Sequence, residues 1–416
     1  MKLKKIIAVA ASAVIAAGAF SGCGGEKSGG SGKVTIESVS LPDKLDGDTI
    51  RVMAYDGWEE EHGNIRQMLK DWYGVDVEYI VVDWTEQKNK LAVDLAANIT
   101  YDVVPVSNDL VLNNLCEPLT QYFDMDEEIF STYKSIAESM TFDGELYGVP
   151  SVPNMEVIIY NKTLIENLGY DLPLDLYNAG NWNWDTFKSL ATGLAKEKTA
   201  GGEAITAFSS WDTTLFLKAN NTGFIKWEGT DYKLNLDDSK LREALNYFKE
   251  LCTTGAFTGW QGWSQADFQL GTSAMIVDRF GNKTHFVSDL TFDWDFVPVP
   301  TGYSGDENVA PGTIATYGIP AGSNNPTGGA AYIYLFCKQD YDRRKEYLAN
   351  YLSDEQIERF ESLYSKISRT YETIGLSNTD ELIWEIADGA DVTSTLEAYK
   401  TKWQGELDTY TAGLKK

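Results

Sequence analysis

Aromatic rings and carboxylates are the side chains most able to do chemistry in this chain, because histidine is almost absent. Only His62 and His285 occur in 416 residues, which leaves little material for a histidine-based zinc site or a histidine-dependent triad. No GxGxxG, Walker, HExxH or GxSxG motif is present. The 62 acidic residues allow paired-acid glycosidase chemistry in principle, but no spacing selects two of them. We therefore expect no enzyme, and an extracellular glycan-active enzyme stays open as the alternative.

The remaining reactive residues predict neither a cofactor nor a metal ion. Cys116, Cys252 and Cys337 lie in no CxxC or other metal-binding spacing. We expect these three to be buried free thiols, while one disulfide among them stays open. A calcium ion also stays open for the acidic stretch 124–128, although no EF-hand pattern occurs.

Tryptophan is frequent, and several tryptophans fall on polar stretches between expected helices and strands. The chain has 12 Trp and 23 Tyr. The tryptophans on polar stretches are Trp58, Trp84, Trp182, Trp211, Trp260 and Trp263. An indole ring covers the apolar C–H face of a pyranose well, while neighbouring amides and carboxylates bind its hydroxyl groups. Packing between lobes explains each tryptophan singly just as well, but together they favour a cleft that binds a carbohydrate.

The elements that must position these side chains begin with an alternation of strands and helices. β-Branched and aromatic runs predict strands at 49–55, 75–82 and 101–106, and apolar spacing predicts helices at 59–72 and 85–97. This order is typical of a parallel sheet wrapped by helices, and ligands bind beyond the carboxyl ends of such strands. The loops at 56–59, 83–84 and 107–109 are therefore expected at a binding site.

The rest of the chain continues as an α/β protein, and its length indicates two lobes. Helices are expected at 184–196, 240–252, 326–338, 340–360 and 379–410, and strands at 273–277 and 292–299. A chain of 416 residues exceeds what one hydrophobic core usually serves. One rigid domain remains the alternative.

The first 23 residues have the order of an export signal. Three lysines precede an apolar stretch at 6–20, and small residues stand directly before Cys23. The apolar stretch is too short for a comfortable membrane span. The arrangement resembles the lipobox of bacterial lipoproteins, although Phe20 replaces the usual leucine. The resemblance implies a signal peptide at 1–22, a lipid such as palmitate on Cys23, a flexible tether at 23–47 and anchoring at the extracytoplasmic face of the cell membrane. An ordinary secretory signal is the alternative.

The surface of the protein is expected to be strongly acidic. The formal net charge is −27, and removal of residues 1–22 takes away three lysines and no acid, so the mature chain carries −30. Such a surface argues against nucleic acid or anionic lipid as a partner. It favours cationic solutes only weakly, because physiological salt screens the attraction beyond about 8 Å.

Five short motifs occur in the order found in one protein family. Residues 146–150 (LYGVP) followed by 158–162 (IIYNK) resemble the YGVP…YNK crossover of extracellular solute-binding proteins of family 1, the maltose-binding type, which serve ABC importers. The other matches are 184–187 (WDTF), 268–275 (FQLGTSAM), 294–300 (WDFVPVP) and 319–323 (IPAGS) with Pro326 and Ala330. Each motif alone is weak, but the five in order span about residues 48–400.

The resemblance implies an α/β, type II periplasmic-binding-protein-like fold with two lobes and a three-segment hinge. It places the N-terminal lobe at 48–152 plus 317–365 and the C-terminal lobe at 153–312 plus 370–416, with crossovers near 152–156, 312–317 and 365–371. The ligand would lie in the cleft between the lobes, which close on it by hinge bending.

The resemblance also implies partners. The chain would be a monomeric substrate-binding subunit that captures a carbohydrate and delivers it to ABC permease subunits in the membrane. The number of loop aromatics favours an oligosaccharide. A peptide, polyamine or organic acid bound by the same fold is the alternative.

The expected loops and the family's motif positions together give thirteen candidate ligand-binding residues. They are Trp58, Glu59, Trp84, Ser107, Asn108, Asp109 and Asn154 in the first half, and Trp211, Asp212, Trp260, Trp263, Asp278 and Arg279 in the second. The family often has glycine and an aromatic residue where Asp278 and Arg279 stand. Arg279 therefore leaves open an acidic ligand such as a uronate, and a buried Asp278–Arg279 pair that only orients itself is the alternative.

Overall fold

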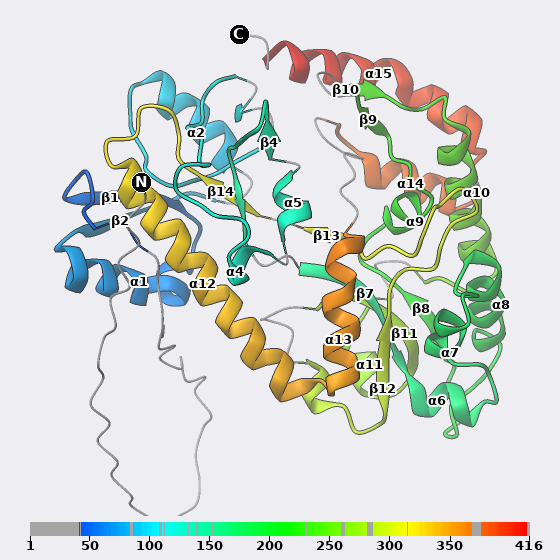
Figure 1. The fold of residues 1–416 in the computed structure, drawn as a ribbon. Coiled ribbons are helices and arrows are strands. Elements are labelled where there is room, and N and C mark those ends of the chain that lie inside the picture. Colours follow the sequence, from blue (N-terminus) through cyan, green and yellow to red (C-terminus); the bar gives the residue numbers. More distant parts are fainter. Residues whose placement is uncertain are drawn as a thin grey trace, which may run out of the picture.

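The computed structural model describes residues 41–413 with short gaps, and Figure 1 shows two α/β lobes beside each other. The gaps are 42, 84–85, 108–109, 112, 132, 139, 152–153, 229–231, 259–262, 281–285, 314 and 368–375. The expected signal peptide, Cys23 and most of the tether lie outside the described residues.

Within the described ranges, no helix is both long and apolar enough to cross a membrane. The same ranges contain no cluster of three or more His, Cys, Asp or Glu side chains arranged to hold a metal ion.

The first lobe begins with the predicted parallel strand–helix–strand unit. β1 (Thr49–Ala54) pairs in parallel with β2 (Asp76–Val81) over six residue pairs. α1 (Trp58–Tyr73) joins them and is flanked by two glycines in the left-handed region, Gly57 at φ 85° and Gly74 at φ 72°. A side chain would be strained at either position, so these glycines determine where the helix begins and ends.

The third predicted strand, 101–106, is shortened. The remaining elements of this lobe are α2 (Gln87–Ala96), β3 (Val104–Pro105), α4 (Glu128–Ser131), α5 (Lys134–Glu138), β4 (Thr141–Phe142), β5 (Glu145–Leu146), β6 (Val149–Pro150), β14 (Thr316–Gly318) and α12 (Pro326–Tyr351). Val103 still bridges Val52 of β1 in parallel, but β3 then pairs antiparallel with β14, which also pairs with β6. Pro105 has no N–H to donate, which limits the length of this strand.

α12 is one helix of 26 residues where the sequence predicted two. The side chain of Asn325 caps its start. Its first half carries Tyr332 and Phe336 into the core of the first lobe, beneath β1 and α1. Its second half carries Tyr347 and Leu348 into a different cluster, which includes residues of the second lobe's sheet. The helix therefore extends from one lobe to the other, as Figure 1 shows.

The second lobe is built on a five-stranded sheet in the order β12-β7-β11-β8, with β13 also paired to β7. The strands are β7 (Asn154–Asn161), β8 (Thr206–Ser209), β11 (Ser273–Phe280), β12 (Trp294–Val297) and β13 (Gly312–Thr313). β8 and β11 are parallel, whereas β7 is antiparallel to β11 and β12. Side chains alternate between the two faces of a sheet. Ile158 and Val277 accordingly join one hydrophobic cluster, and Val157 and Ile276 join another.

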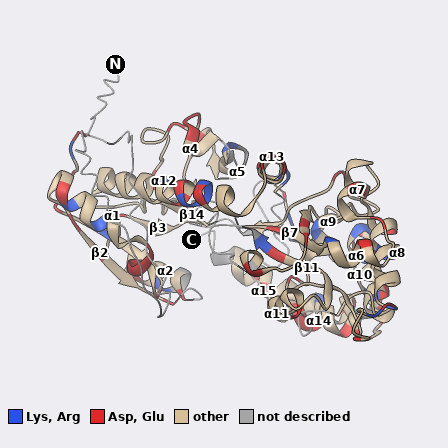
Figure 2. Cartoon of the chain, turned by 90° about the horizontal axis from the view of Figure 1, so that it is seen from below, with Lys and Arg blue, Asp and Glu red and all other residues tan. Residues whose placement is uncertain are grey.

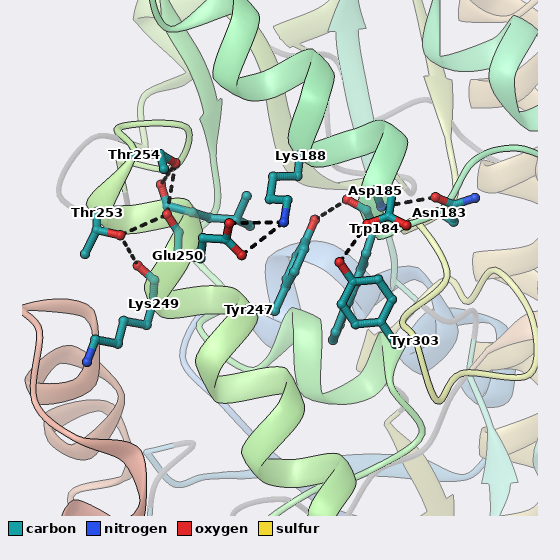
Figure 3. A network of polar contacts seen from close by, with 11 residues as sticks. Asn183, Trp184, Asp185, Lys188, Tyr247, Lys249, Glu250, Thr253, Thr254 and Tyr303 are labelled. Atoms are coloured by element: carbon teal, nitrogen blue, oxygen red, sulfur yellow. Dashed lines mark hydrogen bonds and ion pairs between the residues drawn. The ribbon is translucent and has the colours of Figure 1, made fainter.

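Most helices of the second lobe pack on the first of these faces. They are α6 (Lys162–Asn167), α7 (Pro173–Asn178), α8 (Trp184–Leu194), α9 (Leu215–Ala219), α10 (Ser239–Thr253), α14 (Thr379–Ala387) and α15 (Val392–Gly413), with the hairpin β9 (Ile225–Trp227) and β10 (Tyr232–Leu234). Figure 3 shows how α8 and α10 are joined: Trp184 and Tyr247 stack at 4.0 Å, and Lys188 pairs with Glu250 at 3.0 Å. The predicted helix 379–410 is divided in two at Gly389, whose φ is 110°.

The second face of this sheet is covered by α11 (Gln265–Gln269), α13 (Asp354–Ser362), the 3-10 turns Phe286–Asp289 and Leu363–Lys366, and the end of α12. Arg359 of α13 pairs with Asp295 of β12, and Phe360 packs on Phe296. The sequence-based boundaries assign α13 to the N-terminal lobe, within 317–365. Because α13 contacts the second lobe's sheet, we propose that the boundary lies before α13. The other lobe boundaries stay predictions.

Two passages of the chain between the lobes run next to each other. β6 precedes β7, and β13 precedes β14 in the opposite direction. Met155 of β7 pairs with Gly312 of β13, and Pro150 of β6 pairs with Thr316 of β14. These pairs lie at the ends of their strands, and hinge closure is commonly absorbed by a few residues at the ends of such elements.

Candidate ligand-binding site

Trp58, a candidate of the first lobe, is part of the hydrophobic core. Its side chain is 2% exposed, and its ring stacks on Phe336 of α12 with 5.2 Å between centroids. Its Nε1–H donates to the hydroxyl of Tyr332 at 2.8 Å. The structure places Trp58 in the first turn of α1 instead of on an open loop. The prediction that Trp58 contacts a ligand is therefore wrong, because its ring is covered by the protein itself.

The other first-lobe candidates are on the surface or lie outside the described residues. Glu59 is exposed on α1 and pairs with Arg66, whose guanidinium lies 4.7 Å from the centroid of the Tyr79 ring. Ser107 is half-buried, and its carbonyl accepts a hydrogen bond from the N–H of Leu110. Trp84, Asn108 and Asp109, and also Trp260 of the second lobe, lie outside the described residues. Asn154 is the first residue of β7. Except for Trp58, these positions remain predictions.

Three second-lobe candidates come together at one end of the sheet. The chain leaves β8 and enters a loop with Trp211 and Asp212, and the parallel strand β11 ends beside this loop with Arg279. The guanidinium of Arg279 lies over the ring of Trp211, 4.1 Å from its centroid. This is the carboxyl end of two parallel strands, where α/β sheets commonly bind ligands.

Glu156, which no sequence motif singled out, completes this group. It is the cross-strand partner of Arg279, and its Oε1 lies 3.9 Å from the Arg279 Nε. Its side chain is buried, and its carboxyl group is a neighbour of the Asp212 carboxyl group. Burial, followed by the charge of Asp212, raises the pKa of Glu156 well above its usual value. The sequence could have pointed to Glu156, because alternation along β7 places this acidic residue on the same face as the buried Ile158 and Tyr160.

Asp212 is held by donors from the following segment. Its carboxylate lies 2.9 Å from the Nζ of Lys218 on α9. It also accepts hydrogen bonds from the N–H and the hydroxyl of Thr214, at 2.8 and 2.7 Å. Burial by itself would raise the pKa of Asp212, but Lys218 and these hydrogen bonds bring that pKa below its usual value. Asp212 therefore anchors the loop that carries Trp211.

Trp263 and Asp278 lie on the other face of the sheet. The indole N–H of Trp263 donates to the carbonyl of Val277 at 2.8 Å, and its ring packs on the second hydrophobic cluster. Asp278 is buried and accepts a hydrogen bond from the Nε2 of Gln265 at 2.6 Å. Burial raises the pKa of Asp278. Because adjacent strand residues face opposite ways, the side chains of Asp278 and Arg279 lie on opposite faces of the sheet, which argues against the alternative of a pair that only orients itself.

A cavity of about 610 Å³ opens between the Trp211 loop and α14. Its lining residues are Trp211, Thr213, Asp380, Glu381, Trp384, Glu385 and Asp388. The two indoles supply apolar surface, and the hydroxyl of Thr213 donates to Asp380 at 2.7 Å, which links the loop to the helix. The volume falls within the range of about 300–1,000 Å³ that is common for small-molecule sites.

The described lining of this cavity has many more hydrogen-bond acceptors than donors. Asp380, Glu381, Glu385 and Asp388 supply four carboxylates, and no Lys or Arg is among the described lining residues. Such a lining suits a ligand with many hydroxyl or amine donors and an apolar face, and it repels an anion. Arg279 is engaged with Trp211 and Glu156 instead of lining the cavity, which argues against the uronate alternative.

The α14 residues of this lining were missed by sequence reasoning, although one signal was present. Trp384 and Glu385 follow Glu381 by three and four residues, and the C-cap Asp388 follows Trp384 by four, which places them on one side of the helix. Acidic residues in this spacing are ordinary on a solvated helix. The pattern indicates a binding site only because the Trp211 loop lies beside this helix and lines the same cavity. The acidic residues in the described part of the chain are spread over both lobes, as Figure 2 shows.

Known proteins share this architecture. The profile of the family described as bacterial extracellular solute-binding protein matches residues 56–356. No curated protein matches the chain. UspC of M. tuberculosis has a TM-score of 0.66 at 15% identity, and the alignment covers 86% of this chain and 100% of that one. The cyclic alpha-maltosyl-1,6-maltose binding protein of Arthrobacter globiformis has a TM-score of 0.64 at 15% identity, with 87% and 99% covered. The Listeria monocytogenes protein Lmo0181, solved in complex with cycloalternan, has a TM-score of 0.62 at 17% identity, with 87% and 99% covered. These likenesses show the predicted two-lobe fold.

Proposed function

The chain belongs to the family of bacterial extracellular solute-binding proteins, and on this basis we propose that it captures a carbohydrate for an ABC importer. The ligand, an oligosaccharide, is held between the two lobes and delivered to permease subunits in the membrane. The protein binds this ligand without altering it. A monomer suffices for this role.

One observation carries the proposal: two tryptophans and four carboxylates line one cavity beside the carboxyl ends of β8 and β11. Indoles match the C–H faces of pyranose rings, and carboxylates accept hydrogen bonds from sugar hydroxyls. Two structural neighbours support a saccharide ligand: the cyclic alpha-maltosyl-1,6-maltose binding protein, and Lmo0181 in complex with cycloalternan.

The binding free energy expected from these contacts is sufficient to capture a ligand. A micromolar dissociation constant corresponds to about −8 kcal/mol. Each aromatic contact contributes about 0.5–1.5 kcal/mol beyond area burial, and each hydrogen bond to a charged group contributes about 1.5–3 kcal/mol. At the middle of these ranges, two rings and four carboxylate contacts sum to about 11 kcal/mol, which exceeds this requirement before the entropy of closure is subtracted.

Both lobes contribute contacts in this proposal. Trp211, Thr213, Trp384 and the acidic residues of α14 form the wall of the second lobe. Sequence-predicted positions form the remainder, namely Glu59, Trp84, Ser107, Asn108, Asp109, Asn154 and Trp260. Closure of the two lobes, through the paired crossovers at Met155 and Gly312, brings these walls together around the ligand.

We also propose that the mature chain is a lipoprotein anchored through Cys23. The acyl chains hold it at the extracytoplasmic face of the membrane, close to the permease, and each buried CH₂ contributes about 0.8 kcal/mol. Mass spectrometry of the membrane fraction tests this proposal. It predicts a diacylglyceryl group on Cys23, and an unmodified, secreted chain would contradict it.

An amine-bearing solute such as a polyamine is the second candidate. It is favoured by one observation, the four carboxylates of a lining in which no described residue is a cation. Protonated amines would meet these carboxylates and the two indole faces, which attract cations. The two candidates differ in salt dependence, since an ammonium ligand loses affinity as ionic strength rises and a neutral sugar does not.

A thermal-shift panel of maltotriose, laminaritriose, cellotriose, xylotriose and spermidine tests the proposal. A ligand at 100 times its dissociation constant adds about 2.7 kcal/mol to the free energy of unfolding, which is a shift of several degrees. We expect a shift with at least one trisaccharide, and Trp384→Ala reduces it. Trp72→Ala is the control, because Trp72 is an exposed tryptophan of α1 in the other lobe. A shift with spermidine alone supports the second candidate, and no shift with any saccharide contradicts the first.

A further inference from the structure

Glu156 is a carboxyl group in a place where a negative charge is unfavourable. Its side chain is 2% exposed on the face of β7 that carries Ile158 and Tyr160 into the hydrophobic core. Among the described residues, no N–H or O–H group donates to its Oε2. An ionised carboxylate in this position would be a buried charge without donors, whereas a protonated one supplies its own O–H.

The charged groups around Glu156 come from three other segments. Asp212 belongs to the loop after β8, Lys218 to α9 and Arg279 to β11. Lys218 lies 2.9 Å from Asp212, and the Arg279 guanidinium is placed over the Trp211 ring. Arg279 approaches Glu156 only at the long end of ion-pair range, with its Nε 3.9 Å from the Glu156 Oε1. The remaining neighbour in β11, Asp278, faces the opposite side of the sheet.

We propose that Glu156 is a neutral carboxylic acid whose proton bridges it to Asp212, and that this bridge positions Trp211 for the ligand. The proposal rests on the proposed function in one respect, that Trp211 contacts the ligand. Loss of the proton places two carboxylates side by side and draws Arg279 from Trp211 toward Glu156. Both changes displace the ring that forms one wall of the cavity. Glu156 is thus a positioning residue, which acts through Asp212 and Arg279.

The same bridge connects the ligand loop to the crossover. Glu156 directly follows Met155, which pairs with Gly312 of the second passage between the lobes. Asp212 directly follows Trp211. A single hydrogen bond therefore joins the loop that faces the ligand to the strand at which the lobes are connected.

The direction of the pH effect follows from burial and from Asp212, which together raise the pKa of Glu156. The folded protein keeps this proton at pH values where the unfolded chain, with a glutamate pKa of about 4.3, has lost it. Stability therefore decreases as pH rises from that value through the folded pKa. Ligand affinity decreases in the same direction, because the protonated form holds Trp211 in place.

Isothermal titration calorimetry between pH 5.5 and 9 tests this proposal, with the trisaccharide of the panel that gives the largest thermal shift. Wild-type affinity is expected to fall above the pKa of Glu156 by up to about tenfold per pH unit, the limit for one proton. Glu156→Gln keeps an N–H that donates to Asp212, so its affinity stays within about threefold of the low-pH wild type at every pH. Glu156→Ala removes the bridge and loses about tenfold in affinity even at low pH.

Glu166→Gln is the matched control, because Glu166 is a half-exposed glutamate of α6 in the same lobe, 4.0 Å from Lys162. It keeps the wild-type pH dependence. A Glu156→Gln variant that keeps the wild-type pH slope, or a Glu156→Ala variant with wild-type affinity, overturns the proposal.

Two measurements without ligand separate this proposal from the proposed function. Relative to wild type, the melting temperature of Glu156→Gln is expected to rise by about 2–4 °C between pH 5.5 and 8.5, because the variant has no proton to lose. The Trp211 fluorescence, obtained by subtracting the Trp211→Phe spectrum, is expected to change with pH in wild type and to stay constant in Glu156→Gln. If no saccharide binds, the proposed function fails, and these two measurements still decide the bridge. The bridge is contradicted if the melting temperature and the Trp211 fluorescence depend on pH in the same way in wild type and in Glu156→Gln.

Discussion

Trp58 and Trp211 each follow a strand of their lobe's sheet, and the structure uses them in opposite ways. Trp58 is covered by Tyr332 and Phe336 of α12, two residues that come more than 270 positions later in the chain. Trp211 stands at the edge of a cavity, with Arg279 over its ring. A tryptophan after a strand is brought to the edge of the sheet in both cases. Whether it becomes core or binding surface depends on which distant element packs on it.

Substitution of Trp58 should have the largest effect on stability. Trp58→Ala removes a fully packed indole, and we expect the free energy of unfolding to fall by about 3–5 kcal/mol. Urea unfolding measures this change. At a temperature where the variant stays folded, its ligand affinity should equal that of wild type. A loss of affinity without a loss of stability would place Trp58 in the site after all.

A smaller effect is expected from the hydrogen bond that holds Trp58. Tyr332→Phe leaves the buried Nε1–H of Trp58 without its acceptor at 2.8 Å, and it should lower the free energy of unfolding by about 1–3 kcal/mol. Tyr334→Phe on the same helix is the control, because the Tyr334 hydroxyl donates to the part-buried Glu127 at the surface. If both variants lose the same free energy of unfolding, the hydrogen bond to Trp58 stabilises the protein no more than a surface hydrogen bond does.

Trp211→Ala is expected to act on binding instead of folding. Loss of one stacked ring should weaken the ligand by about tenfold, which corresponds to about 1.4 kcal/mol. Isothermal titration calorimetry measures the affinity, and urea unfolding of the free protein should show a smaller loss than Trp58→Ala. Trp211→Phe should restore part of the affinity. If Trp211→Ala unfolds the protein while affinity is unchanged, the two tryptophans have the same role and the contrast is wrong.

The smallest expected effect comes from single carboxylates of the cavity. Glu385→Gln keeps the shape of the lining and removes one charge from an exposed position, so affinity for a neutral trisaccharide should change by less than about threefold. The same variant should weaken spermidine more strongly at low salt. A large loss for the trisaccharide would mean that Glu385 is more deeply enclosed in the complex than in the free protein.

Much of the fold follows from local patterns in the sequence. The alternation at 49–55 and 75–82, with Gly57 and Gly74 around the intervening helix, predicted the parallel unit β1–α1–β2, which the structure confirms. The family resemblance placed Trp211, Asp212 and Arg279 in the ligand cleft, and the structure brings these three residues together at one end of the second lobe's sheet. These features depend on residues close in sequence or on the register of neighbouring strands, and both are visible in a single chain.

What could not be predicted depends on contacts between distant segments. The burial of Trp58 requires α12, and the cavity requires α14 to lie beside the loop at Trp211. Glu156 was present as a polar residue on a buried face of β7, but its partners Asp212 and Arg279 come from other strands. The sequence predicted helices at 326–338 and 340–360 where the structure has the continuous helix α12, because packing of this helix against the cores of both lobes overrides local pattern.

Small-angle X-ray scattering with and without saccharide tests the central claim most directly, that two lobes close on a carbohydrate. We expect a smaller radius of gyration for the wild-type protein at a saturating concentration of the best trisaccharide. Trp211→Ala should need a higher concentration of the trisaccharide for the same change. A wild-type scattering profile that stays the same with every saccharide of the panel would contradict it.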